Sequence, residues 1–225
     1  MSSIYEKNFT DKGYRMNYEK IGKNFILKNQ VLQFKIELQE ISPIIWRRIL
    51  VPSDYNFWDL HVAIQDSMGW KDYHLHDFEI RGKGKRKAVK IGIPDFDRTG
   101  DREEVYPGWE IPVFVYFNEL GLKADYEYDY SDSWIHTVQL EGYLYKEMRI
   151  KYPICIGGER ACPPEDCGGV SGYYNVLKTI SDIANEDYEG MKVWAGQDWK
   201  PEWFYKDLVI FDDPYKRWRG SFLKK

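Results

Sequence analysis

The sequence predicts a single-domain α+β fold in which a mixed or antiparallel sheet of hairpins packs with a few helices. Segments 31–38 and 44–51 each suit a strand, and the short turn between them is typical of a hairpin. Strands and helices do not alternate regularly enough along the chain for a doubly wound parallel sheet. At 225 residues, the chain is long enough to bury a sizeable core.

The chain is predicted to have three parts. Residues 1–30 show weak periodicity and suit an N-terminal extension, residues 31–211 suit the α+β domain, and residues 212–225 suit a basic tail. Inside the domain, residues 81–104 form a polar insert whose basic first half precedes an acidic second half. We expect an exposed loop or a long hairpin there, because the two halves attract each other.

The clearest helix signal in the domain ends at Met68. Residues 53–56 offer N-cap side chains, apolar residues follow at helical spacing from Phe57, and Gly69 suits the position past the C-terminus. The later helices are expected over residues 171–183 and 188–195.

Further strands are expected over residues 74–80, 126–130, 134–140 and 152–156. In the first of them, period two places His74 and His76 on one face. The second and third are expected to form a hairpin with a three-residue loop. In that register, Tyr130 faces Trp134 and Tyr128 faces His136.

Composition excludes several classes of protein. A net charge of −4 and an isoelectric point near 5.7 argue against a chain coated in basic residues for nucleic-acid binding. We find no basic and apolar leader, and no stretch approaches the ~18 apolar residues of a membrane span. We therefore expect a cytoplasmic protein without a membrane partner. Aromatic residues make up 17% of the chain, an excess that suits either a core or a contact surface.

All three cysteines lie in residues 155–173, a stretch rich in Gly and Pro that suits a shaped loop. An odd number of cysteines favours thiols or metal ligands over a disulfide framework. One hypothesis is a zinc site, although the cysteines are spaced more loosely than in most zinc motifs. Its candidate ligands are Cys155, Cys162 and Cys167, with His74, His76 or His136 as the fourth. The alternative is that the cysteines are buried apolar residues, or that Cys162 and Cys167 form a disulfide.

His136 is a candidate for acid–base catalysis. Asp129 and Asp132 lie close to it in the predicted hairpin, where a carboxylate could orient the imidazole as a general base. A simpler role for Asp132 is to bind amides of the turn.

Cationic side chains supply candidate contacts to an anion or a partner. Arg160 could hold a carboxylate or phosphate through its guanidinium fork, or pin the loop to Glu165 or Asp166. Arg47 is expected to face solvent or a neighbouring acid. The basic half of the insert could contact phosphates or simply be solvated. Its candidate residues are Lys83, Lys85, Arg86 and Lys87.

Several distinctive motifs lie between residues 31 and 210. They are Ile45–Ile49, Asp59–His61, Met68–Trp70, His74–Phe78, Tyr126–Asp129, Asp132–His136 and Gly158–Gly169. Together they resemble the Ri-plasmid open-reading-frame-three-like family, whose members are also described as insertion-element passenger proteins. The resemblance implies an α+β fold and carriage on plasmids or insertion elements in some members. It implies no established activity and no catalytic residues. Tyr130-Ser131 stands where the family usually has a Phe-Gly pair.

Three functions remain open at this point. The first, which the genetic setting of the family favours, is a mobile-element-associated accessory protein that binds nucleic acid or protein. The second is a hydrolase-like enzyme that uses a metal ion or acid–base chemistry through the His, Asp and Cys set. The third is a structural role for that set, with function in a protein–protein surface.

Overall fold

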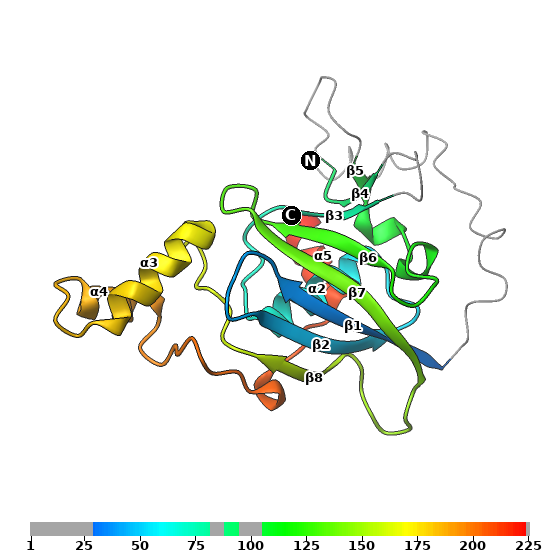
Figure 1. The fold of residues 1–225 in the computed structure, drawn as a ribbon. Coiled ribbons are helices and arrows are strands. Elements are labelled where there is room, and N and C mark those ends of the chain that lie inside the picture. The colour runs from blue at the N-terminus through cyan, green and yellow to red at the C-terminus, as the bar shows by residue number, and fades with distance from the viewer. Residues whose placement is uncertain (1–28, 82–87, 95–104, 224–225) are drawn as a thin grey trace, which may run out of the picture.

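The computed structural model describes residues 29–81, 88–94 and 105–223, and an eight-stranded sheet forms the centre of this described part (Figure 1). The strand order is β5-β4-β3-β6-β7-β1-β2-β8. Neighbouring strands are antiparallel except β4 and β5, which are parallel. The strands are β1 (Gln30–Leu38), β2 (Ile45–Pro52), β3 (His76–Ile80), β4 (Val89–Gly92), β5 (Val105–Pro107), β6 (Lys123–Tyr128), β7 (Trp134–Tyr145) and β8 (Ile154–Glu159). The predicted α+β fold is confirmed.

The strands bury alternate residues, as the period-two pattern predicts. In β1, Phe34 and Ile36 are fully buried, whereas Lys35 and Glu37, which alternate with them, are half-buried. The buried face of the sheet packs with residues of several helices into a single apolar core. Burial of this face therefore supplies much of the free energy that holds the sheet together.

Helix α2 (Phe57–Met68) packs into this core. Asn56 caps it by accepting the N–H of Asp59 at 2.8 Å, and the Asp59 carboxylate accepts the N–H of Asn56 at 3.1 Å. This reciprocal capping box satisfies two backbone donors at the helix start. Gly69 ends the helix in the left-handed conformation, with φ 91°, which glycine adopts without steric cost. The predicted helix and its C-terminal glycine are confirmed.

In the described part of the chain, three further helices lie outside the sheet. Helices α3 (Gly169–Ser181) and α4 (Tyr188–Ala195) pack against each other and extend away from it (Figure 1). Helix α5 (Pro214–Phe222) lies within the predicted basic tail and packs on α2. Short 3-10 helices are η2 (Gly108–Glu110), η3 (Val113–Val115) and η4 (Lys206–Leu208). None of the helices described is long and apolar enough to cross a membrane.

The predicted register of the β6–β7 hairpin is wrong by two residues. Tyr128 pairs with Trp134 and Tyr126 with His136, so the loop has the five residues 129–133. The Asp129 carboxylate closes this loop by accepting the Ser131 N–H at 2.9 Å. Because the shift is an even number of residues, each side chain stays on its predicted face.

The polar insert is described only in part. Its strand β4 pairs antiparallel with β3, as one arm of a hairpin would. The remainder of the insert, residues 82–87 and 95–104, and the predicted extension up to residue 28 lie outside the described residues.

Candidate functional site

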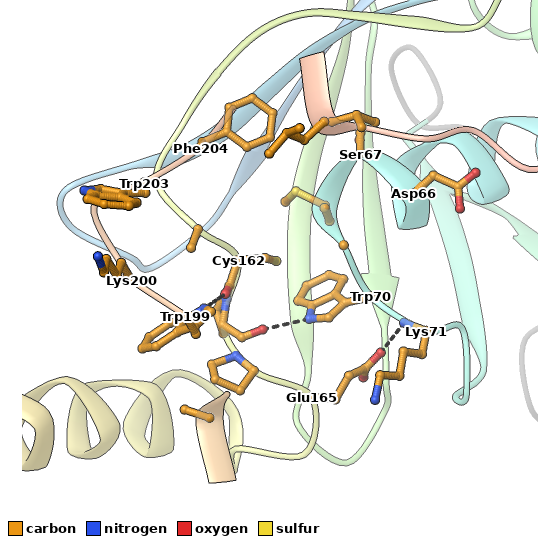
Figure 2. A pocket seen from close by; sticks show the side chains of 18 of the residues that line it. Asp66, Ser67, Trp70, Lys71, Cys162, Glu165, Trp199, Lys200, Trp203 and Phe204 are labelled. Atoms are coloured by element: carbon orange, nitrogen blue, oxygen red, sulfur yellow. Dashed lines mark hydrogen bonds between the residues drawn. The ribbon is translucent and has the colours of Figure 1, made fainter. Parts of the chain in front are cut away.

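A cleft of about 760 Å³ opens between three segments that are distant in sequence. The first, residues 66–73, includes the end of α2 and the turn after it. The second, residues 161–166, belongs to the cysteine loop, and the third, residues 194–210, runs from the end of α4 through η4. Figure 2 shows Trp70, Cys162 and Trp199 where these segments meet.

Two tryptophans hold the cysteine loop in place. The indole N–H of Trp70 donates to the Pro163 carbonyl at 3.0 Å, and that of Trp199 donates to the Cys162 carbonyl at 3.0 Å (Figure 2). The backbone N–H of Lys71 also donates to the Glu165 carboxylate at 2.6 Å. Because these hydrogen bonds come from both flanking segments, the two sides of the cleft are fixed relative to each other.

Arg47 lies beneath this cleft and is only 1% exposed. Its Nε donates to the carbonyl of Ser67 at 2.8 Å, and its Nη1 donates to the carbonyls of Trp46 and Glu159 at 2.8 and 3.0 Å. The Phe204 ring covers the guanidinium at 3.7 Å. Burial lowers the pKa of Arg47.

The expectation that Arg47 faces solvent or an acid is therefore wrong. The described residues give it no carboxylate partner, and the carbonyl of Ser67 in the last turn of α2 takes that place. A cation is favourable at this end of a helix, where unpaired carbonyls carry partial negative charge.

Exposed aromatic side chains line the outer part of the cleft. Trp194 and Trp203 are each 50% exposed and Tyr205 is 56% exposed, although large aromatic surfaces are normally withdrawn from water. The Lys200 ammonium lies 3.7 Å from the Trp203 ring centre, a cation–π contact at the rim. The outer cleft thus combines apolar surface with a charged edge.

The three cysteines are free thiols, and none belongs to a potential metal-binding group in the described part of the chain. Burial raises the pKa values of Cys155 and Cys162, and raises that of Cys167 to about 12. All three therefore favour the neutral thiol at pH 7 in the metal-free protein. The structure does not gather the cysteines with His74 and His76 into the single cluster that the zinc hypothesis requires.

His74 and His76 do not share a face, contrary to expectation. Strand β3 begins only at His76, so His74 lies in the preceding loop, where strand alternation does not apply. The His74 Nε2 lies 2.9 Å from the Asp166 carboxylate. His76 is buried instead, and its ring stacks on that of His61 with 3.4 Å between the centroids.

His61 belongs to a buried polar network whose partners the sequence did not reveal. Its Nδ1 lies 2.8 Å from the Tyr126 hydroxyl, and its Nε2 lies 2.8 Å from the Asp72 carboxylate. Because Gln65 donates to the Tyr126 oxygen, the hydroxyl hydrogen is free to donate to His61 Nδ1. The Nε2–H of His61 then donates to Asp72. These groups come from α2, β6 and the turn after α2, so no spacing along the sequence indicates the network.

The structure also separates His136 from Asp129 and Asp132. The His136 ring is fully buried against Trp70, and burial lowers its pKa to about 4. Asp132 accepts the N–H of Gly168 at 3.0 Å, whereas Asp129 accepts the amide of its own loop. Neither carboxylate hydrogen-bonds to His136, so the described contacts do not orient this imidazole as a general base.

Arg160 pairs with Glu202, not with Glu165 or Asp166. It therefore pins the cysteine loop to the third segment of the cleft, where its guanidinium is already engaged. The other predicted cationic contacts lie outside the described residues. They are Lys83, Lys85, Arg86 and Lys87.

Residues 30–207 match the family model described as plasmid pRiA4b ORF-3-like protein. The chain belongs to this family. It is 29% identical over 167 residues to the uncharacterized protein y4hQ of Sinorhizobium fredii (strain NBRC 101917 / NGR234), a match covering 74% of the chain and 81% of that protein. The crystal structure of the protein of unknown function MM3350 from Methanosarcina mazei Go1 is similar, with 38% identity and a TM-score of 0.71. That match covers 81% of this chain and 98% of the other.

The match to the plasmid pRiA4b ORF-3-like family confirms the resemblance drawn from the motifs. The matched residues include the tryptophans that hold the cleft together, Trp70 and Trp199, and the exposed Trp203. Helix α5 lies beyond the matched residues. The cleft is therefore built almost wholly within the family domain.

Proposed function

We propose that the cleft binds a segment of a partner protein, so that this member of the family acts as a binding protein. The observation that carries the proposal is the half-exposure of Trp194 and Trp203 beside a cleft whose inner walls are fixed by hydrogen bonds. Tryptophan, tyrosine and arginine dominate the positions that contribute most to protein–protein binding. Large exposed apolar patches also mark interaction sites on soluble domains.

The charge of the cleft favours a protein segment over nucleic acid. Its lining has three basic residues and four acidic ones, which gives no net positive charge. A groove that follows a phosphate backbone needs a positive surface beside its stacking aromatics. The charged lining residues are Arg47, Lys71, Lys200, Asp66, Glu165, Asp166 and Asp198.

A preformed frame also supports binding. Trp70 and Trp199 attach the cysteine loop to its two neighbours, and Arg160 adds an ion pair with Glu202. A site that is already ordered loses little conformational entropy when a ligand arrives. A short peptide should therefore retain measurable affinity outside its parent protein.

The enzyme hypothesis receives less support from the same geometry. His136 is fully buried in the core. Burial also disfavours the thiolate form of the three cysteines. General acid–base catalysis needs a titrating group within hydrogen-bond reach of a bound substrate. An acid–base role for His136 with Asp129 and Asp132 stays an alternative proposal. If the protein shows an enzymatic activity and His136→Gln retains it, this proposal is refuted.

The test is selection of peptides from a random library on the intact protein, followed by calorimetry with the enriched sequence. Replacing Trp203 by alanine is expected to raise the Kd roughly 30-fold, because a hot-spot side chain contributes about 2 kcal/mol. Tyr145→Ala is the matched control, because this tyrosine is 77% exposed but lies outside the cleft lining.

Two results would contradict the proposal. One is the absence of any enriched peptide. The other is a peptide whose affinity is the same in Trp203→Ala and in wild type. A thymidine oligonucleotide is titrated in parallel, and Trp203-dependent binding of this oligonucleotide alone would replace the proposal with single-strand nucleic-acid binding.

A further inference from the structure

Two groups of histidine and carboxylate side chains in the described part of the chain bring their potential ligand atoms within 4.8 Å of one another. One is His61, Asp72 and His76, and the other is His74, Asp129 and Asp166. The first lies in the core beside α2. The second lies at the surface, where the loop before β3, the β6–β7 loop and the cysteine loop meet.

The inner group has the wrong geometry for a metal ion. The rings of His61 and His76 are stacked at 3.4 Å and are inclined by only 5°. A metal ion must lie near the plane of each imidazole that binds it, and two parallel planes at this separation share no such position. The Nδ1 of His61 is also engaged outside the group, by the Tyr126 hydroxyl.

The outer group has suitable geometry. His74 Nε2 lies 2.9 Å from Asp166 Oδ1 and 3.6 Å from Asp129 Oδ2. Ligands bound to zinc at about 2.0–2.1 Å in tetrahedral geometry lie roughly 3.3 Å apart, and the two distances bracket that value. The side chains of His74 and Asp166 are 29% and 65% exposed, so an ion can reach them from solvent.

Asp129 supplies an independent observation. Its carboxylate is almost completely buried, and its Oδ1 accepts the N–H of Ser131. The other oxygen, Oδ2, accepts no hydrogen bond from the described residues and points toward His74 at a distance too long for one. An ion between Asp129 and Asp166 would give this oxygen a partner and would offset the repulsion of the two carboxylates.

We propose that His74, Asp129 and Asp166 bind a divalent first-row transition metal ion such as Zn²⁺, with water in the remaining positions. One imidazole nitrogen and two carboxylate oxygens suit such an ion better than the purely oxygen-ligated Ca²⁺ or Mg²⁺. The cysteines are not ligands in this proposal. Asp166 also lines the cleft, so the ion would lie at its rim.

Zinc titration by calorimetry tests this site, with the full chain prepared without a metal-affinity tag and treated with a chelator. One equivalent is expected to bind, and His74→Gln and Asp166→Asn are each expected to raise the Kd at least 10-fold. Asp198→Asn, which removes an exposed cleft carboxylate outside the group, should leave the Kd unchanged. Thermal unfolding of each variant confirms that it is folded.

Co²⁺ provides the second readout, because thiolate ligands add a charge-transfer band that nitrogen and oxygen ligands lack. The proposal expects no such band and full binding in Cys162→Ser. It is overturned if wild type shows no saturable zinc binding, if the two ligand variants bind as tightly as wild type, or if the cobalt spectrum reports thiolate.

Discussion

Replacing Arg47 by methionine tests how the cleft is held on the sheet. The substitution keeps an apolar stem of similar length but removes the donors to the carbonyls of Ser67, Trp46 and Glu159. A buried acceptor left unpaired costs about 1–3 kcal/mol. Taking about 1 kcal/mol for each of the three carbonyls, we expect a loss of about 3 kcal/mol in the free energy of unfolding. For a domain of this size, that loss corresponds to a Tm roughly 6–12 °C lower.

The neighbouring arginine provides a matched control. Arg48 points to the other face of β2 and pairs with Glu141 at 2.6 Å, where both side chains are partly exposed. Such pairs contribute about 1 kcal/mol or less, so Arg48→Met should lower the stability only slightly. Urea unfolding followed by circular dichroism measures both variants. If the two lose the same stability within about 0.5 kcal/mol, Arg47 does not anchor the cleft as argued.

Two further predictions concern the buried polar groups. Tyr126→Phe removes the hydroxyl shared by His61 and Gln65 and is expected to cost about 1–3 kcal/mol in urea unfolding. The exposed Tyr145→Phe should cost almost nothing, and equal effects would contradict the network. The pKa of His136 is about 4 in the folded protein, below the unfolded value of 6.5. Between these two pH values the unfolded chain binds more protons than the folded one, so the free energy of unfolding rises with pH. Asp59, whose pKa burial raises to about 6, acts in the opposite direction, so each variant is compared with wild type at every pH. Urea midpoints from pH 4 to 7 should rise less steeply in His136→Gln, and an unchanged slope would refute the assignment.

Local signals predicted α2 correctly because its boundaries depend on nearby residues. Asn56 and Asp59 cap each other three residues apart, and Gly69 adopts the conformation that ends the helix. The same reasoning failed for the β6–β7 register. There the Asp129 carboxylate organises a five-residue loop, and a shift of two residues preserves the apolar pattern on which the prediction depended.

The candidate site was less predictable, because long-range contacts determine it. Alternation along β2 alone could not show that Arg47 reaches the end of α2, 20 residues away. His74 and His76 were expected to act together. Because β3 begins only at His76, His74 lies in the loop before it and contacts Asp166, whereas the His76 side chain is buried in the core. Of the predicted loop 155–173, only residues 160–168 lie outside regular structure, because β8 extends to Glu159 and α3 begins at Gly169. The role of this loop in forming one wall of the cleft emerged only from the tryptophans that bind it.

Trp70 and Trp199 hold the loop through its main chain, and this determines which side chains of the cleft can be exchanged. Trp70 and Trp199 donate to main-chain carbonyls, and the Ala161 N–H donates to the Pro201 carbonyl at 3.0 Å. Every residue type has a main-chain carbonyl, and every type except proline has a main-chain N–H, so these three attachments depend little on which side chains the loop presents. Loop side chains that face the cleft, other than Glu165, which accepts the Lys71 N–H, can therefore be exchanged while the cleft walls keep their spacing. Preference for a partner can diverge among relatives without a new scaffold, provided that the two indole donors are retained.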